Sequence, residues 1–498
     1  MTLAALLPPL ALMTSLLAAV LIFATPEHRS GIRTTINLTA ALLKLLLVAI
    51  MVRGVFQGVD YGLSFSMLPG VTFALRADAL SVMFAGLSAV LWLLTTLYAV
   101  GYLEHSPNRS RFFGFFSLCV ASTMGIALAG NLFTFLLFYE MLTLATYPLV
   151  VHRGTAEALR AGRTYILYTL TGGAVLLVAI AWLHGLVGDL PFRAGGHFQQ
   201  ADAALQTPLT LIFVLLIAGL GVKAAVVPLH GWLPQAMVAP APVSALLHAV
   251  AVVKAGAFGI VRVVYDIYGI ESVATLGLLH PLAWLAAFTI LYGSVRALNQ
   301  TDLKRRLAFS TISQVSYIIL GISLFGPIGT VGGLVHLIHQ GIMKITLFFC
   351  AGNYAETLGV HRVDELDGAG RRMPGTSIAF TIGAFGMIGA PPLAGFITKW
   401  TIASGAIAAH MHWAIAVLLV SSILNAAYFL PIVQRLWFRD AAGDWPHERL
   451  WGRLETSGWL LWPPLVTAVM TVLIGLLAAM PFSPLSWAEL IAAREFQP

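Results

Sequence analysis

The sequence predicts an all-α polytopic membrane protein with about fourteen transmembrane helices. Hydrophobic residues make up 59% of the 498-residue chain and charged residues only 10%, whereas a soluble domain contains about 25% charged residues. The apolar residues fall into runs of about 20, the length that an α-helix needs to cross a bilayer. These observations exclude a soluble globular protein and indicate that nearly all of the chain lies in the membrane.

Fourteen apolar runs follow one another along the chain. Because residues 1–23 lack the positive charge that precedes the apolar core of a signal peptide, we interpret them as the first transmembrane helix. Almost nothing separates the fourth run from the fifth, so Gly130 and Asn131 must form a tight turn. The predicted spans are 3–23, 33–53, 77–103, 112–130, 132–151, 163–186, 208–228, 242–268, 273–295, 307–325, 328–354, 375–400, 410–437 and 458–480.

The distribution of lysine and arginine predicts the orientation of these spans. The loops after odd-numbered spans hold 18 basic residues, including Lys304, and the opposite side holds five, including Arg262. Cytoplasmic loops carry the excess of positive charge in membrane proteins. We therefore expect both termini outside the cytoplasm, in the inner (plasma) membrane of a cell. The net charge of +7 is spread over many short loops and does not indicate nucleic-acid binding.

Two of the spans contain prolines that must interrupt the helix. Pro228 cannot donate a hydrogen bond to the carbonyl of Ala224 in the seventh span, and Pro391-Pro392 leaves the carbonyls of Met387 and Ile388 without donors in the twelfth. Broken helices at corresponding positions are typical of inverted repeats in transporters. We therefore expect four units: helices 1–3 in residues 1–110, one five-helix repeat in 111–270, the second in 271–440, and helix 14 with a short tail in 441–498.

Ionisable side chains inside the apolar runs are the candidate functional residues. A charge at mid-bilayer costs about 3 kcal/mol on insertion scales, so such residues usually face a protein interior or a water-filled path. Glu140 needs a cation nearby, and we predict that it forms a proton-coupling pair with Lys223; a static ion pair is the alternative. Lysine can lose its proton when buried, whereas arginine does not. The predicted route for protons consists of Glu140, Lys223, Lys254, Lys344 and Lys399.

Three histidines accompany these lysines. His336 and His339 share one face of the eleventh span, and no third ligand at metal spacing accompanies them, so a relay or water-bridging role is favoured over a metal site. His248 and Lys254 are six residues apart, which places them on different helix faces. His248 is therefore either a relay member reached through water or another side chain, or a satisfied core histidine.

Several residues leave both a functional and a structural interpretation open. Lys44 lies mid-span in the second helix without a nearby proline break, and His230 lies between two prolines and could cap freed carbonyls. Lys399 ends its apolar run, so its amine could extend to the membrane interface instead. Cys119 and Cys350 are expected to be small buried hydrophobic residues. We find no phosphate-binding loop, dinucleotide motif or cysteine cluster, and so expect no cofactor and no metal.

The stretch around the first helix break is highly specific. It reads K-A-A-V-V-P-L-H-G-W-L-P-Q-A-M at residues 223–237 and A-P-A-P-V-S-A-L-L-H at 239–248. Together with residues 138–140, 339–348 and 392–399, it resembles the antiporter-like subunits of respiratory complex I, membrane-bound hydrogenases and Mrp-type cation/proton antiporters. The resemblance implies fourteen helices, two inverted five-helix repeats, Glu140 and Lys223 as a coupling pair, Lys254 and Lys344 on a central axis, Lys399 as terminal lysine, and histidine relays.

The resemblance also implies a function. We expect a proton-translocating subunit of a multi-subunit cation/proton antiporter, closest in size to the D-type, with other membrane subunits as partners and protons, with or without Na⁺, as cargo. Within the same class, a redox-driven complex or an inorganic-carbon uptake system is the alternative. An alternative of another class is a non-conducting membrane scaffold for a soluble partner. His339 and Lys344 are five residues apart, where many family members have four.

Overall fold

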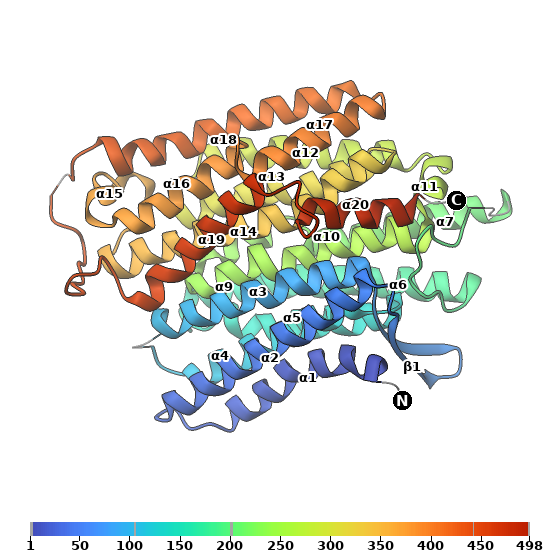
Figure 1. Ribbon diagram of the computed structural model, residues 1–498, viewed down its shortest axis with the longest axis horizontal. Coiled ribbons are helices and arrows are strands. Elements are labelled where there is room, and N and C mark those ends of the chain that lie inside the picture. Colours follow the sequence, from blue (N-terminus) through green and yellow to red (C-terminus); the bar gives the residue numbers. More distant parts are fainter. Residues whose placement is uncertain (1–2, 104–105, 200–202, 442, 497–498) are drawn as a thin grey trace.

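The computed structural model describes residues 3–103, 106–199, 203–441 and 443–496. Long helices lie side by side along one common direction (Figure 1). Within the described residues, twelve helices are long and apolar enough to cross a membrane. The predicted class, a mostly helical membrane protein, is therefore confirmed.

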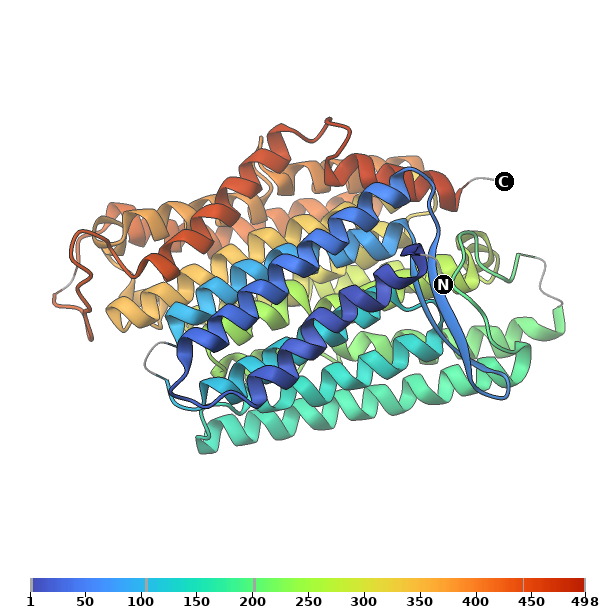
Figure 2. The ribbon, with the colours of Figure 1, turned by 60° about the horizontal axis from the view of Figure 1, so that its bottom comes forward.

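The N-terminal part contains three helices and a hairpin that the hydropathy pattern did not reveal. Strands β1 and β2 form an antiparallel pair between α2 and α3, and Figure 2 shows the pair at one end of the bundle. Asp78 caps α3 by accepting a hydrogen bond from the backbone N–H of Ser81. The elements are α1 (Leu3–Phe23), α2 (Ser30–Phe56), β1 (Tyr61–Leu68), β2 (Val71–Ala77) and α3 (Ala79–Tyr102).

The fourth to eighth predicted spans follow. As expected, a tight turn separates α4 from α5, and Asn131 caps α5 through the N–H of Thr134. The eighth span is not one regular helix, because two π-helical turns interrupt it. The elements are α4 (Arg109–Leu128), α5 (Leu132–Val150), α6 (Ala156–Val187), α7 (Ala203–Lys223), α8 (Trp232–Gln235), η1 (Ala236–Val238), α9 (Ala241–Ala245), η2 (Leu246–Val250), α10 (Val252–Arg262) and η3 (Val263–Tyr268).

The remaining elements complete the expected order. The twelfth span is divided into α16 and α17, and α13 packs against both α12 and α14 at the place of the tenth span. A helix after the last span, α20, was not predicted. The elements are α11 (Ile270–Thr275), α12 (Leu279–Leu298), α13 (Leu303–Ser323), α14 (Pro327–Leu358), η4 (Val363–Glu365), α15 (Ala369–Arg372), α16 (Pro374–Ile388), α17 (Ala394–Ala408), α18 (His412–Phe438), α19 (Gly458–Leu476) and α20 (Pro484–Glu495).

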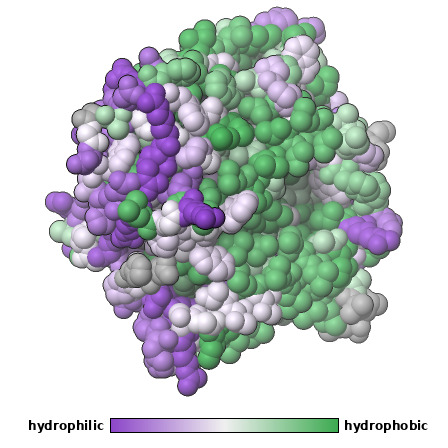
Figure 3. All heavy atoms as spheres, turned by 60° about the vertical axis from the view of Figure 1, so that its left-hand side comes forward, coloured by the Kyte–Doolittle hydropathy of each residue, from purple (hydrophilic) through white to green (hydrophobic). Residues whose placement is uncertain are grey.

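The two ends of the bundle differ in charge. The start of α1, the hairpin and α20 lie at one end, the terminal end, whereas α15 lies at the other (Figure 1). Hydrophilic residues gather on one side of the molecule beside a broad hydrophobic surface (Figure 3). The end that carries α15, called the arginine-rich end below, also holds Arg372, which pairs with Glu448, and Arg449, which pairs with Glu356. The start of α1 and helix α20 lie at the same end of the bundle, as expected for an even number of membrane crossings. Which end faces the cytoplasm stays a prediction.

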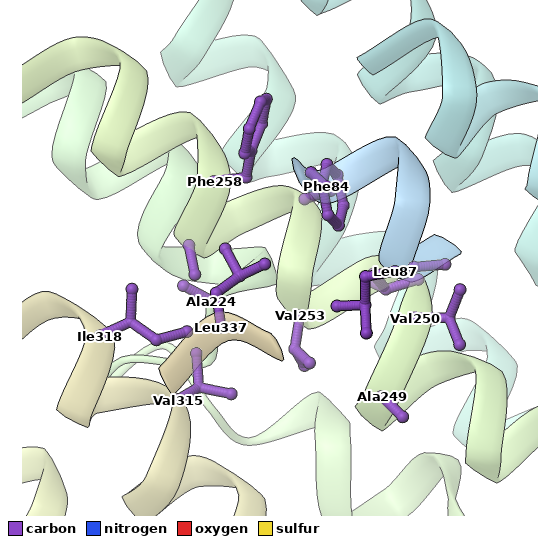
Figure 4. Close-up of a cluster of buried hydrophobic side chains, with 14 of the residues drawn as sticks. Phe84, Leu87, Ala224, Ala249, Val250, Val253, Phe258, Val315, Ile318 and Leu337 are labelled. Atoms are coloured by element: carbon purple, nitrogen blue, oxygen red, sulfur yellow. The ribbon is translucent and has the colours of Figure 1, made fainter. Parts of the chain in front are cut away.

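The span from Ala241 to Tyr268 is buried along its whole length and forms the centre of the bundle. Figure 4 shows apolar side chains around it, with Phe84 of α3 against Phe258 of α10, and Val315, Ile318 and Leu337 from α13 and α14 nearby. The two phenylalanine rings stack with centroids 4.6 Å apart. The polar groups described below therefore lie in a tightly filled apolar surrounding.

Helices α13, α14 and α17 touch backbone to backbone. A Cβ atom on Gly321 would lie 2.5 Å from the backbone nitrogen of Gly333, and one on Gly332 would lie 2.9 Å from that of Ile402. Small residues at helix contacts allow such close approach in membrane proteins. These contacts hold α14, which carries three of the predicted site residues, firmly between its neighbours.

Arg262 was counted among the five basic residues on the non-cytoplasmic side, but the structure places it inside the protein instead of on a surface. Its guanidinium is 1% exposed and bonds the carboxylates of Asp78 and Asp266 at 2.8 and 3.0 Å, and the hydroxyl of Ser81 at 2.7 Å. A buried arginine needs such partners to offset its desolvation. The cluster joins α3 to the end of the central span.

Helix α20 is attached close to this cluster by Glu495. Its carboxylate accepts a hydrogen bond from the backbone N–H of Gly195 at 3.0 Å. Burial, together with the negative charge of Asp266, raises the pKa of Glu495 to about 8. The protonated form is therefore favoured in the folded protein more than in the unfolded chain, where a glutamate titrates near pH 4.3.

The attachment of α20 should weaken progressively as pH rises from about 4, near the pKa of an unfolded glutamate, to about 8. The folded state binds the Glu495 proton more tightly than the unfolded state, so this contribution to stability is present below about pH 4 and is lost as pH passes the folded pKa. Limited proteolysis of the C-terminal segment should accelerate in the native protein, relative to Glu495→Gln, as pH rises from about 4 to about 8, and the difference should level off above that pH. The exposed Glu489 of the same helix gives the control, Glu489→Gln, which should keep the native pH dependence.

Candidate functional site

Glu140 is held on α5 facing a glycine of α6. A Cβ atom built on Gly173 would lie 2.1 Å from its Oε1 atom, so the carboxylate occupies the space that the missing side chain leaves. The Oε1 atom is buried and has no hydrogen-bond partner among the described residues. A carboxylate in this state is costly unless a proton or a cation neutralises it.

Lys223 is the last residue of α7 and is fully buried. Its amine donates a hydrogen bond to the carbonyl of Tyr139 and lies 3.3 Å from the centroid of the Tyr139 ring. Tyr139 directly precedes Glu140, so the structure brings the two predicted partners into one neighbourhood. The described residues contain no ion pair between them within 4.0 Å, and the amine bonds to a backbone carbonyl instead.

The interruption predicted at Pro228 is present immediately after Lys223. Helix α7 stops at Lys223 and the chain resumes in α8 at Trp232. The carbonyl of Val222 accepts from the indole N–H of Trp232 at 2.8 Å and from the backbone N–H of Ala225 at 3.2 Å, so it stays satisfied where the helix ends. The ring of His230 packs 5.0 Å from that of Tyr292, and its Nδ1 atom has no partner among the described residues.

Lys254 and His248 lie on the central span. The Lys254 amine donates to the carbonyl of Leu337 on α14 at 2.7 Å. The His248 ring belongs to the π-helical turn η2 and stacks on Phe348 at 4.5 Å, and neither of its nitrogens has a partner among the described residues. Two ring nitrogens without a protein partner are unlike the satisfied core histidine that was the structural alternative.

His336 and His339 share a helix face but bond to different neighbours. A ring nitrogen of His336 lies 3.0 Å from the carbonyl of Gln314 on α13, and one of His339 lies 2.9 Å from the hydroxyl of Thr398 on α17. Each ring keeps its second nitrogen without a partner among the described residues. No group of three potential metal ligands occurs in the described part of the chain.

Lys344 lies between α14 and α13. Its amine donates to the hydroxyl of Ser310 at 2.8 Å, and the hydroxyl oxygen of Tyr428 on α18 lies 3.0 Å from the same oxygen. Tyr428 is also bonded to the amide oxygen of Asn425. These contacts connect the α14 lysine with α18, whose Asn425 also bonds the carbonyl of Met387 at the second break.

Lys399 points into the second break instead of toward the membrane interface. Its amine donates to the carbonyl of Ile388 at 2.7 Å and to the hydroxyl of Ser422 at 2.8 Å. The amide of Asn425 donates to the carbonyl of Met387 at 3.2 Å. Both carbonyls predicted to lose their donors thus have side-chain partners, and the interfacial alternative for Lys399 is wrong.

Sequence reasoning missed a set of uncharged polar groups beside the lysines. The side-chain nitrogen of Gln314, the hydroxyl of Tyr317 and both amide atoms of Gln340 are buried and without partners among the described residues. Water commonly satisfies such atoms in proteins. The signal was present in the sequence as isolated glutamines within apolar spans, but it is weaker than that of a charge.

Lys304 was expected in a loop, and this expectation is wrong. It lies in the first turn of α13, and its amine donates to the carbonyl of Ala239 at 2.6 Å. Two neighbouring arginines made this turn resemble a loop. Lys304 lines a cavity of about 600 Å³ at the arginine-rich end. Its ionisable lining residues are Arg153, Glu157, Arg160, Asp302, Lys304, Arg305, Tyr102 and His361.

The sequence matches a known family model over most of this site. The model described as "NADH:quinone oxidoreductase/Mrp antiporter, TM" matches residues 129–425, and one for the N-terminus of complex I chain 5 matches residues 67–113. The chain belongs to the NADH:quinone oxidoreductase/Mrp antiporter transmembrane family. The predicted resemblance is therefore confirmed.

Individual members of this family match along most of their length. NADH-quinone oxidoreductase subunit N of Desulforudis audaxviator is 34% identical over 413 residues, covering 79% of each chain. The D-type subunit of the Na(+)/H(+) antiporter of Bacillus subtilis is 29% identical over 404 residues, covering 81% of this chain and 80% of the relative. A chain of the Mrp complex from Dietzia sp. has a TM-score of 0.88 and 25% identity, covering 100% of this chain and 98% of that one.

Trp232→Phe should lower the stability of the protein by about 0.5–1.5 kcal/mol, because the carbonyl of Val222 loses one of its two donors, the backbone N–H of Ala225 remaining, while the ring packing against Tyr165 is kept. Thermal unfolding of the purified protein in detergent would measure the loss. Trp462 is 64% exposed, so Trp462→Phe is the matched control and should change nothing. Equal melting temperatures for the two variants would contradict the proposed role of the indole.

Proposed function

We propose that this chain translocates protons as a subunit of a multi-subunit cation/proton antiporter. The observation that carries the proposal is the state of the lysines. Within the described residues no lysine takes part in an ion pair, and those of the apolar spans bond to carbonyls or hydroxyls instead. An amine without a fixed counter-charge in this surrounding can exchange a proton at low cost, whereas a structural ion pair would hold its charge.

The proposed route follows the buried groups in order. Protons enter near Glu140, pass Lys223, Lys254 and Lys344 with His248, His336 and His339 as relays, and leave near Lys399. The unpartnered atoms of Gln314, Gln340 and Tyr317 support this route, because water that bonds to them would bridge the lysines. The polar cavity beside Lys304 offers access from the arginine-rich end.

The energies involved are compatible with coupling. Moving one charge across 100 mV is worth about 2.3 kcal/mol. One pKa unit corresponds to about 1.4 kcal/mol, so a change of fewer than two units in a lysine balances that work. Small changes around a buried amine, such as the approach or neutralisation of Glu140, are large enough to move a proton on or off it.

The similar proteins support partner subunits in the membrane. The Mrp complex of Dietzia sp. and the archaeal membrane-bound sulfane sulfur reductase, with a TM-score of 0.86 and 25% identity, are multi-subunit assemblies. The match of this chain to the D-type antiporter protein of Bacillus subtilis supports the antiporter. Its match to subunit N of an NADH-quinone oxidoreductase supports a redox-driven complex as the second candidate. We place the chain in the plasma membrane with both termini outside, and assign no sodium site to it.

Replacing either member of the first pair should abolish transport. Glu140→Gln and Lys223→Ala, each in the assembled complex, should reduce cation/proton exchange in inside-out vesicles at least tenfold, because a proton can then neither arrive at nor leave the start of the route. Assembly is checked by co-purification of the other subunits. Normal assembly with undiminished exchange would contradict the proposal and favour the non-conducting scaffold.

Gly173→Ala tests the position of the Glu140 carboxylate without removing it. The new methyl group would lie 2.1 Å from the present Oε1 position, so the carboxylate must move. Exchange should fall by about the same factor as in Glu140→Gln. The matched control on the same helix is Gly185→Ala, whose Cβ atom meets nothing within 4 Å and which should retain the native rate.

A further inference from the structure

A buried lysine lies outside the proposed route. Lys44 of α2 is fully buried, and its amine bonds to the hydroxyl of Ser15 on α1. It also lies 4.4 Å from the centroid of the Trp92 ring on α3. The amine therefore points into the space between the first three helices, away from the lipid.

No carboxylate faces Lys44 from the described helices around it. Helices α1 and α3 contain no Asp, Glu, Lys, Arg or His, and α4 contributes no acid. Besides Lys44, the ionisable groups of the described parts of α1 to α4 are Arg33, Arg53, Tyr98, Tyr102, Arg109, Arg111 and Cys119. Helix α20, which contacts α2 at Val55 and Phe56, adds Glu489, Arg494 and Glu495, about three turns of α2 away from Lys44. The positive charge of a protonated Lys44 is thus opposed by desolvation and supported only by a hydroxyl and an indole face.

A row of buried polar side chains leads from the arginine-rich end to within about two helical turns of Lys44. Arg33 donates to the hydroxyl of Ser110 at 2.8 Å, and Asn37 donates to the carbonyl of Arg33 at 3.1 Å. Ser117 donates to the amide oxygen of Asn37 at 3.2 Å. Asn37 and Lys44 are seven residues apart, so both lie on one face of α2 two turns from each other. We call Arg33, Asn37, Ser110 and Ser117 the α2–α4 seam.

The opposite wall of the Lys44 site also carries unsatisfied polar atoms. Ser88, Trp92 and Thr96 are spaced four residues apart on α3, and the side-chain oxygen or nitrogen of each is buried without a partner among the described residues. Three such atoms in a row are unusual in a natural protein. They belong to α3, which contacts both α2 and α14.

We propose that Lys44 is a further proton-binding site, which exchanges one proton with the arginine-rich end through the α2–α4 seam. The neutral amine takes up a proton from water and becomes an ammonium stabilised by Ser15 and the Trp92 ring; release returns the proton to water. This site lies outside both predicted repeats and stores charge beside the main route. Proton binding at Lys44 does not depend on the proposed function; only its role in transport rests on that function.

Direct proton counting tests the site without relying on transport. The purified complex is acidified from about pH 10 to about pH 5, which spans the range in which buried lysines titrate, and the protons taken up are measured with an indicator dye. Lys44→Met and Lys44→Gln should each take up one proton fewer per chain than the native complex. Lys44→Arg should show the same deficit, because its guanidinium keeps its proton throughout. Equal uptake by native and variant complexes would overturn the proposal.

The seam is tested by the rate of uptake. Asn37→Leu keeps the amine, so it should take up the native number of protons but at least tenfold more slowly after a pH jump; an unchanged rate would overturn the route through the seam. Lys223→Ala in the exchange assay tests the proposed function separately. The two tests are independent. Equal proton uptake in the Lys44 variants would overturn the Lys44 site without affecting the proposed function, and undiminished exchange in Lys223→Ala would contradict the proposed function without affecting the Lys44 site.

Discussion

The structure depends on how backbone carbonyls released at two breaks within the membrane are satisfied. In hydrocarbon an unpaired carbonyl costs several kcal/mol, so a broken helix survives only where other groups bond to it. At the first break Trp232 and the backbone N–H of Ala225 both donate to the carbonyl of Val222, and at the second Lys399 and Asn425 supply the donors. The second break thus uses one of the candidate proton carriers as a structural donor, which ties the geometry of that site to its protonation.

The same principle applies to the buried lysines, because each amine needs a hydrogen-bond partner inside the protein. Each amine has at least one carbonyl or hydroxyl partner on a neighbouring element: Tyr139 for Lys223, Leu337 for Lys254 and Ser310 for Lys344. These partners accept a hydrogen bond from the neutral amine as well as from the ammonium. The surroundings therefore tolerate both charge states, which is the property that a transfer site needs and that an ion pair lacks.

Much of this site could be predicted because its residue types are rare in hydrocarbon. Lysines, a glutamate and prolines within apolar runs identified the two breaks, and the bonds of Ile388 and Met387 show that the expected loss of donors was real. The π-helical turn that holds His248 could not be predicted, because hydropathy carries no information on local helical pitch. Lys304 and Arg262 were misplaced because adjacent charges near a span end look alike whether they face water or a protein interior. The hairpin and α20 are too short to give a transmembrane signal.

The glycine contacts of α14 limit the kind of motion that can accompany activity. Where Gly321 meets Gly333, no side chains separate the helices that could slide or re-interdigitate, and Gly332 lies against both the backbone and the side chain of Ile402. A rocking-bundle cycle, in which one half of a carrier tilts against the other, would move α13, α14 and α17 together, because all three lie within the predicted second repeat, residues 271–440. Any gating in this region must therefore be local, through rotamer changes and rewetting around a stationary frame.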